Sequence, residues 1–264
     1  MTGRDPARDP ARDPARDPGR DPACASEGDV RFGRTDAGAA SFPGVQSLAW
    51  RTGSSGADAA DAVIADAYDV RAQQYVGLAG AVDQMDPRDR DAIARWRDAT
   101  PGRLLDAGCG PGHWTRFLAD GGDGREVSGL DVSATFIASA RSRFPDLRFD
   151  ISSFRALAQE TASVGGILAW YSLIHTAPPD LPDVLAEFAR VVAPGGSILI
   201  GYFEGEARAP FTHAVVDAYY WSADALAELL SDAGFTVVSR ERRERVVGEI
   251  SSRPHGAVVA LRVG

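Results

Sequence analysis

Residues Leu104–Gly112, which read LLDAGCGPG, decide the fold. The first four residues are typical of a short buried strand, and glycines 108, 110 and 112 predict a tight turn before a helix that begins near His113. Because glycine has no side chain, a ligand can approach this backbone, and the N–H groups at the start of the helix can receive a carboxylate. In an open parallel sheet, ligands bind at the carboxyl ends of strands, where this turn would lie. The stretch therefore predicts a ligand site on an α/β sheet.

Strands and helices alternate after this stretch, and repeated strand–helix units require a parallel sheet covered on both faces. The last two strands follow each other with no helix between them, which makes them antiparallel. The predicted fold class is therefore α/β, with a doubly wound, mostly parallel, seven-stranded sheet and an antiparallel last strand. The predicted strands are residues 103–107, 127–130, 147–151, 166–171, 197–203, 235–239 and 256–263, and helices begin near residues 113, 133, 181 and 222.

Two further helices are expected ahead of the sheet. From about Ala57, Val63 and Val70 recur at helical spacing, and Tyr68 and Tyr75 stand on neighbouring turns. The second helix begins at residues 86–87, where an aspartate cap precedes a proline in its preferred first position.

The amino-terminal part of the chain has a different composition. Residues 3–22 are five tetrapeptides, Gly-Arg-Asp-Pro or Ala-Arg-Asp-Pro, and a proline at every fourth position prevents a helix. Residues 23–56 are rich in glycine, serine and alanine. We expect residues 1–56 to be a disordered repeat tail and linker, and residues 57–264 to form one domain.

Composition excludes several classes of function. The net charge of −9 argues against a broad basic surface for nucleic acid or anionic lipid. The sequence has no lysine, which excludes a P-loop, a Schiff-base enzyme and a Tyr-x-x-x-Lys reductase. Cys24 and Cys109 form neither a disulfide framework nor a metal cluster, so we expect no metal. With no apolar span or signal peptide, we expect a cytoplasmic protein that acts on a small molecule.

Acidic residues flank the glycine turn. Asp131 ends the second strand, where a carboxylate can accept both hydroxyls of a ribose, as in nicotinamide-binding domains. Here, however, the glycine spacing is G-x-G-x-G rather than G-x-G-x-x-G, and Asp106 precedes the glycines. A carboxylate there can act on an ammonium group, which a dinucleotide lacks. These details favour a cofactor other than a nicotinamide dinucleotide.

Four segments in this order resemble successive motifs of small-molecule class I S-adenosylmethionine-dependent methyltransferases. They are residues 104–112, 129–133 (GLDVS), 168–175 (LAWYSLIH) and 191–196 (VVAPGG). The resemblance covers roughly residues 57–264 and implies the Rossmann-like methyltransferase fold with S-adenosyl-L-methionine as cofactor.

The resemblance also implies roles for residues near the turn. Asp106, Gly108 and Gly110 would hold the methionine part of the cofactor, Asp131 its ribose, and Tyr68 would close over it. Where the family usually has Gly-Asp to meet adenine, this sequence has serines, so Ser153 would make a weaker contact and Phe154 would pack on the ring. Both residues also fit a simpler role, as a cap and a buried ring. Trp170 and Tyr171 alternate on the fourth strand, so one is expected at the cofactor (Trp170) and the other at the substrate (Tyr171).

Histidines and tyrosines beyond the strand ends are candidates for contact with the methyl acceptor. His175 is the best placed general base for a hydroxyl acceptor, although a structural role fits equally well. His213 and Tyr220 lie in an insertion after the fifth strand, where substrate pockets of such enzymes form. The predicted function is methyl transfer to an O, N or C atom of a small molecule. The alternatives are a cofactor-binding protein without transfer activity and a nicotinamide-dependent oxidoreductase.

Overall fold

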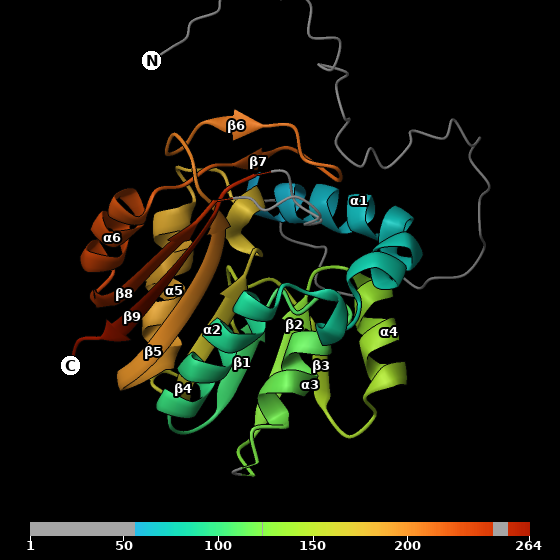
Figure 1. The fold of residues 1–264 in the computed structure, drawn as a ribbon, viewed down its shortest axis with the longest axis horizontal. Coiled ribbons are helices and arrows are strands. Elements are labelled where there is room, and N and C mark those ends of the chain that lie inside the picture. Colours follow the sequence, from blue (N-terminus) through green and yellow to red (C-terminus); the bar gives the residue numbers. More distant parts are fainter. Residues whose placement is uncertain (1–55, 123, 245–252) are drawn as a thin grey trace, which may run out of the picture. The chain divides into compact units, whose positions relative to one another are not determined.

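A computed structural model describes residues 56–122, 124–244 and 253–264. Within these residues the chain forms a seven-stranded sheet in the order β3-β2-β1-β4-β5-β9-β8, together with a two-stranded β6-β7 pair (Figure 1). All neighbours from β3 to β5 are parallel, whereas β9 runs antiparallel to both β5 and β8. The predicted fold class, including the reversed last strand, is confirmed. The predicted tail lies outside the described residues except for Gly56, so the domain boundary stays a prediction.

The strands are β1 (Leu104–Ala107), β2 (Val127–Asp131), β3 (Arg148–Ile151), β4 (Val164–Trp170), β5 (Val192–Phe203), β6 (Pro210–Phe211), β7 (Ala218–Tyr219), β8 (Phe235–Arg243) and β9 (His255–Arg262). The α-helices are α1 (Gly56–Ala79), α2 (Pro87–Ala99), α3 (His113–Ala119), α4 (Ala134–Arg143), α5 (Leu181–Val191) and α6 (Ala223–Asp232). Single 3-10 turns, η2 (Val82–Gln84) and η3 (Leu173–His175), complete the described elements.

Capping residues set the helix starts that the sequence predicted. Asp86 accepts a hydrogen bond from the backbone N–H of Arg88 and precedes the proline that opens α2. Ser133 accepts from Phe136 N at the start of α4, and Ser222 accepts from Ala225 N at the start of α6. Each cap satisfies a backbone donor that has no partner inside its helix.

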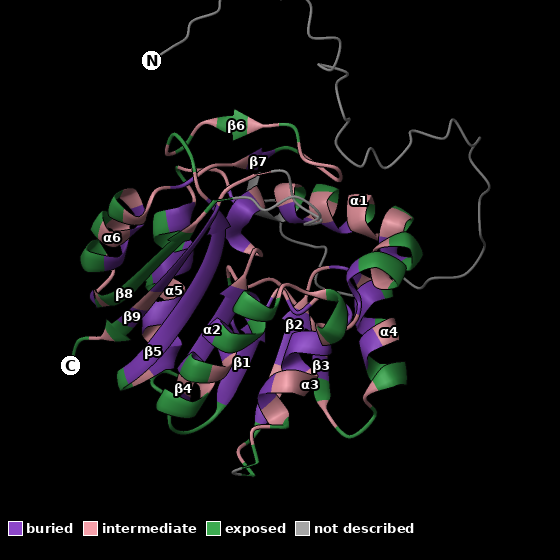
Figure 2. Cartoon of the chain, in the orientation of Figure 1, coloured by how far each residue is buried: buried purple, intermediate pink, exposed green. Residues whose placement is uncertain are grey.

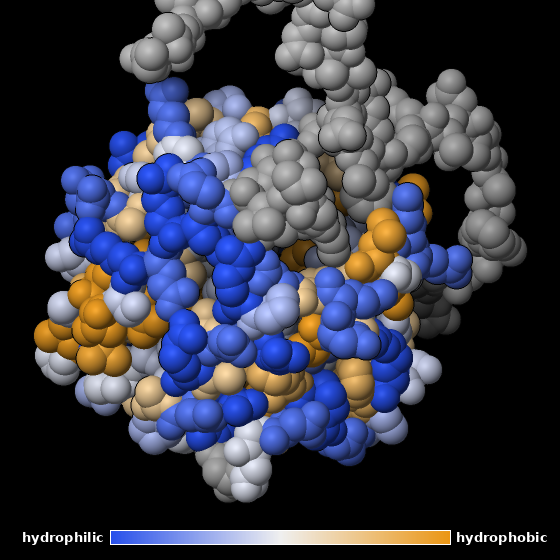
Figure 3. Space-filling model, viewed as in Figure 1, coloured by the Kyte–Doolittle hydropathy of each residue, from blue (hydrophilic) through white to orange (hydrophobic). Residues whose placement is uncertain are grey.

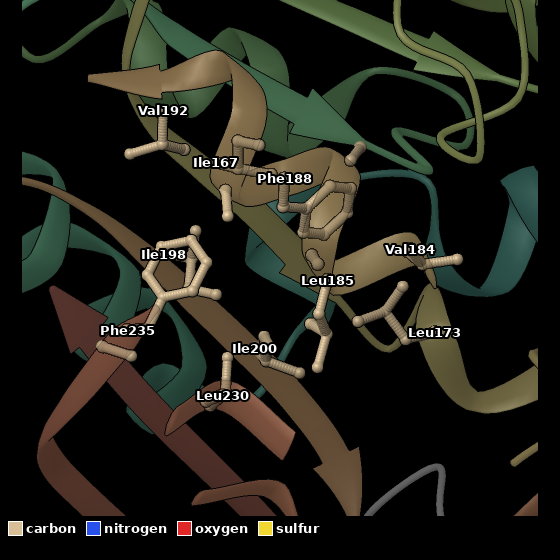
Figure 4. Packing of buried hydrophobic residues seen from close by; sticks show 14 of the residues in the cluster. Ile167, Leu173, Val184, Leu185, Phe188, Val192, Ile198, Ile200, Leu230 and Phe235 are labelled. Atoms are coloured by element: carbon tan, nitrogen blue, oxygen red, sulfur yellow. The ribbon is translucent and has the colours of Figure 1, made fainter. Parts of the chain in front are cut away.

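The largest hydrophobic cluster lies between the sheet and helices α5 and α6 (Figure 4). Phe188 of α5 is fully buried among side chains of β4 and β5, and Figure 4 shows its ring beside Ile167 and Leu185. A second cluster, which includes Ile93 and Trp96 of α2, covers the opposite face together with α3. The central strands β1, β4 and β5 are largely purple in Figure 2, whereas β8 at the edge of the sheet is largely green. Hydrophilic side chains dominate the face shown in Figure 3. The two clusters make this a doubly wound sheet.

Helix α1 was predicted at the right place but with the wrong buried face. Val63 and Val70 are 58% and 86% exposed, whereas Ala65 and Ala72 are buried. Helix α1 crosses the carboxyl ends of the strands (Figure 1). It contacts His175 and Phe136 through Tyr68, a polar and aromatic side chain, so the spacing of its valines did not predict its buried face. No described helix combines the length and the apolar character that crossing a membrane requires.

Core packing gives the first test. Phe188→Ala should lower the free energy of unfolding by about 3–5 kcal/mol, because it leaves a cavity in the main cluster. Val70→Ala is the matched surface control and should change it by less than about 0.5 kcal/mol. Urea denaturation followed by circular dichroism measures both. A large loss for Val70→Ala would contradict the exposed position of this side chain.

Candidate functional site

The glycine turn between β1 and α3 leaves open space in front of its backbone. Gly108 and Gly112 have φ values of 81° and 83°, in the left-handed region that favours glycine. A Cβ on Gly108 would lie 2.3 Å from the Cβ of Ser172, so packing also requires glycine there. A Cβ on Gly110 would meet nothing within 4 Å. The turn is thus packed against Ser172 at Gly108 and faces open space at Gly110, so a ligand can approach its backbone there.

Two buried carboxylates flank this turn. Asp106 is 2% exposed, and its Oδ2 accepts a hydrogen bond of 2.7 Å from the Thr115 hydroxyl. The two oxygens of Asp131 accept from backbone N–H groups, Oδ2 from Gly110 at 2.9 Å and Oδ1 from Ser133 at 2.8 Å. None of the ion pairs found among the described residues involves either carboxylate.

Burial makes these carboxylates costly to ionise. It raises the pKa of Asp106 to about 7, and the nearby charge of Asp131 adds to that effect. Burial likewise raises the pKa of Asp131 to about 6, against the opposing effect of its backbone hydrogen bonds. A ligand that brings positive charge or hydrogen-bond donors would favour the ionised forms. The site is therefore suited to a cationic ligand with hydroxyl groups.

A third polar group near the turn is the Ser172 hydroxyl. It is buried and has no hydrogen-bond partner among the described residues. A buried donor without a partner costs free energy that a ligand atom can recover. Together with the open space at Gly110, this hydroxyl indicates that the residues present fit a polar cofactor.

Helix α1 covers the strand ends through contacts along its length. Tyr68 and Tyr75 pack on the Phe136 ring of α4, with centroids 5.5 and 5.2 Å away. Asp69 accepts from Thr135 N at 3.1 Å and from the Ser133 hydroxyl at the start of α4. Other contacts of α1 join Asp61 to Arg155 at 3.0 Å and Arg71 to the carbonyl oxygen of Ala214. The helix forms a roof that brings Tyr68, Asp69 and Tyr75 near Asp131.

His175 lies beneath this roof, at the end of η3. Its Nδ1 is 3.0 Å from the carbonyl oxygen of Asp217, and its Nε2 is 2.9 Å from the Tyr68 hydroxyl. A carbonyl oxygen only accepts, so Nδ1 carries the proton and Nε2 accepts from Tyr68. Burial lowers the pKa of His175, which favours the neutral imidazole. The predicted lid residue and the predicted base are thus brought together.

The predicted substrate residues converge on one aromatic cluster. The Tyr171 ring lies 5.0 Å from Phe203, and His213 lies 5.1 Å from His175 and 6.3 Å from Phe203. Tyr220 stacks on Phe211 at 4.2 Å, which in turn contacts Phe203. The insertion that carries β6 and β7 therefore adds rings to the carboxyl ends of β4 and β5.

Tyr171 joins this cluster to a separate cavity. Its φ of 54° is unusual for a residue other than glycine, and its hydroxyl contacts Nδ1 of His255 at 2.5 Å. Tyr171 and His255 both line a cavity of about 190 Å³ between α2 and strands β8 and β9. Arg243 and Asp89 form an ion pair in its wall. Strain at Tyr171 is consistent with a functional position.

Three predicted cofactor residues have other contacts. The Ser153 hydroxyl accepts a 3.0 Å hydrogen bond from Arg155 N, and the Phe154 ring lies edge-on to Phe188, 6.2 Å away. These are the cap and the buried ring that the sequence left open as an alternative. Trp170 packs over Gly201 in the cluster beneath α2. Their contact with adenine or cofactor stays a prediction.

Sequence reasoning missed several residues of the site. Ser172 directly follows the predicted Tyr171, so its position at a strand end was a usable signal. Asp69, Phe203 and His255 had no such signal, because their roles depend on contacts between distant segments. Among the described residues, no group of three or more His, Cys, Asp or Glu side chains could hold a metal ion.

The buried carboxylate predicts a pH-dependent stability. Because folding raises the pKa of Asp106 to about 7, its contribution to stability is full below pH 4 and is lost as the pH rises through 7. Asp106→Asn removes this titration, so the variant should gain stability relative to wild type between pH 4 and pH 8. Urea denaturation across this range measures the difference, with the exposed Asp150→Asn as control. Parallel pH profiles for Asp106→Asn and wild type would contradict the burial argument.

Comparison with known proteins agrees with this geometry. Residues 104–196 match the family model of a methyltransferase domain. Over 133 residues the chain is 32% identical to a trans-aconitate 2-methyltransferase from Methylobacterium nodulans, a match that covers 49% of this chain and 48% of the relative. The chain thus spans about half the length of this curated relative.

Solved structures share the fold. A 1,6-didemethyltoxoflavin-N1-methyltransferase from Burkholderia thailandensis, bound to 1,6-didemethyltoxoflavin and S-adenosylhomocysteine, is 23% identical with a TM-score of 0.62, over 77% of this chain and 88% of that chain. The [4+2]-cyclase SpnF is 19% identical with a TM-score of 0.64, over 76% of this chain and 96% of that chain. The family match over residues 104–196 and the sheet topology together show that this part of the chain is similar to a methyltransferase domain.

Proposed function

We propose that the domain formed by residues 57–264 transfers a methyl group from S-adenosylmethionine to a small-molecule acceptor. The observation that carries this proposal is the pair of buried carboxylates, Asp106 and Asp131, beside an open glycine turn. S-adenosylmethionine has an ammonium group, a sulfonium and two ribose hydroxyls, which match acceptors of this kind. When bound, it supplies a methyl group on positively charged sulfur.

Each residue near the turn has a role in this proposal. Asp106 receives the ammonium group, directly or through water, and Asp131 receives the ribose hydroxyls. Gly108 and Gly110 allow the methionine part to approach the backbone. Ser153, Phe154 and Trp170 stay candidates for the remaining contacts.

Catalysis requires the acceptor and the methyl carbon to be held in line, and this alignment supplies most of the acceleration. The roof formed by α1 excludes water from the site, and the aromatic cluster of Tyr171, His213 and Tyr220 holds the acceptor. Where the acceptor bears a proton, the neutral His175 can accept it.

The acceptor is proposed to be a small molecule rather than nucleic acid, and the protein to act in the cytoplasm. The net charge of −9 supports a small-molecule acceptor, because nucleic acid requires a basic surface. The aromatic rings in the proposed acceptor region support it as well. The similar trans-aconitate 2-methyltransferase makes small organic acids sensible first members of an acceptor panel.

A second candidate is a protein that binds the cofactor without transferring its methyl group. The likeness to the [4+2]-cyclase SpnF favours it, because one fold hosts different reactions. Turnover of methyl-labelled S-adenosylmethionine with a metabolite panel separates the two candidates.

Ligand choice is the first test of this proposal. Isothermal titration calorimetry should detect S-adenosylhomocysteine with a micromolar Kd and should show no heat of binding for NADH. The expected preference follows from the glycine spacing and the buried Asp106. Tight binding of NADH without a response to S-adenosylhomocysteine would sink the proposal in favour of an oxidoreductase.

The ribose contact gives the second test. Asp131→Asn should weaken S-adenosylhomocysteine binding by about 10- to 100-fold, because hydrogen bonds to a charged group contribute about 1.5–3 kcal/mol. Asp150→Asn, on neighbouring β3 and exposed, is the matched control and should leave the Kd within about twofold of wild type. Equal Kd values for the two variants would remove Asp131 from the binding site.

A further inference from the structure

We propose that Tyr68 relays a proton from the methyl acceptor to His175, so that the two side chains act as one proton-accepting pair. The pair joins α1 to the segment after β4, across 107 positions of sequence. This inference rests on the proposed methyl transfer and applies to acceptors that lose a proton.

Hydrogen-bond geometry fixes the direction of the pair. The Asp217 carbonyl holds the proton of His175 on Nδ1, which leaves the Nε2 lone pair pointing at the Tyr68 hydroxyl, 2.9 Å away. Tyr68 therefore donates its only proton to Nε2. The lone pairs of its oxygen stay available to accept a proton from a substrate group.

The position of Tyr68 places this oxygen next to the proposed cofactor site. Its ring packs on Phe136, in the helix that Ser133 caps directly after Asp131. Burial, together with the nearby Tyr75 and Asp131, raises the pKa of Tyr68 well above its usual value. A phenol in this setting does not act as an anionic base. It can pass on its proton only while it receives another.

The relay conserves atoms and charge. As the acceptor lone pair forms its bond to the methyl carbon, the carbon–sulfur bond breaks and its electron pair stays on sulfur. The acceptor's proton moves to the Tyr68 oxygen, while the Tyr68 proton moves to Nε2 of His175. Tyr68 ends neutral, the imidazole becomes an imidazolium, and the positive charge lost from sulfur reappears on His175.

The contacts around His175 favour a neutral imidazole before the proton transfer. Burial lowers its pKa, against the opposing effects of the Asp217 carbonyl and of the Asp217 charge, and the other groups that face it are Tyr68 from α1 and His213 from the insertion. The pKa of His213 is itself lowered to about 3, chiefly by burial, so this neighbour is neutral too. The cations Arg253 and Arg71 also act on His213 and lower its pKa further.

The test uses the full chain with nitrogen-15-labelled histidine and the variant Tyr68→Phe. In wild type, NMR should show His175 with its proton on Nδ1 and a hydrogen-bonded Nε2. In Tyr68→Phe the Nε2 resonance should move to the position of a free lone pair. Tyr202→Phe, which removes a buried hydroxyl on β5, is the matched control and should leave the His175 resonances unchanged.

Turnover provides the second readout once the panel identifies an acceptor. Tyr68→Phe should lower kcat by about 100-fold with little change in KM, since general acid–base steps contribute at least about that much. The double variant with His175→Gln should be no slower than the slower single variant, as expected for residues that act as one unit.

The outcomes separate the relay from the methyl-transfer proposal. An Nε2 resonance that does not respond to Tyr68→Phe, or additive losses in the double variant, would overturn the relay while S-adenosylhomocysteine binding upholds the cofactor site. Absence of S-adenosylhomocysteine binding in wild type, with the His175 resonances as expected, would overturn methyl transfer instead.

Discussion

The central constraint in this domain is the burial of two carboxylates that form no ion pair with any residue that the structure describes. Asp106 and Asp131 end adjacent parallel strands, so the topology of the sheet brings them to one edge. The rest of the site compensates for their burial. Thr115, Gly110 and Ser133 donate hydrogen bonds, and the glycine turn keeps its backbone close enough to do so. A cationic cofactor would complete the compensation that the protein supplies only in part.

The inward face of helix α1 carries polar and aromatic side chains, whereas the inward face of an ordinary surface helix is apolar. Helix α1 is held by Asp61, Asp69 and Arg71 and by two tyrosines, whereas two of its valines, Val63 and Val70, face solvent. The net contribution of such hydrogen bonds to stability is small, because the same groups can form hydrogen bonds with water instead. The roof is therefore held mainly by polar and aromatic contacts with several distant segments.

Much of the fold followed from local sequence signals. The glycine turn, the caps at Ser133 and Ser222, and the absence of a helix between the last two strands each depend on neighbouring residues alone. The buried face of α1 was predicted wrongly, because its partners are polar groups from distant segments. Within the site, the residues of the turn could be placed from their order. The Tyr68–His175 contact could not, because nothing local records that the two segments meet.

The reversed strand has a consequence for how the domain is assembled. Strand β9 comes last in sequence order yet lies between β5 and β8, and β8 pairs with no other strand in the sheet. During synthesis, β8 leaves the ribosome with an unpaired edge and nothing to join until β9 follows. The same strand begins at His255, beside Tyr171. Completion of the sheet and formation of the Tyr171–His255 contact are thus one late folding event, and a chain arrested before β9 would have neither.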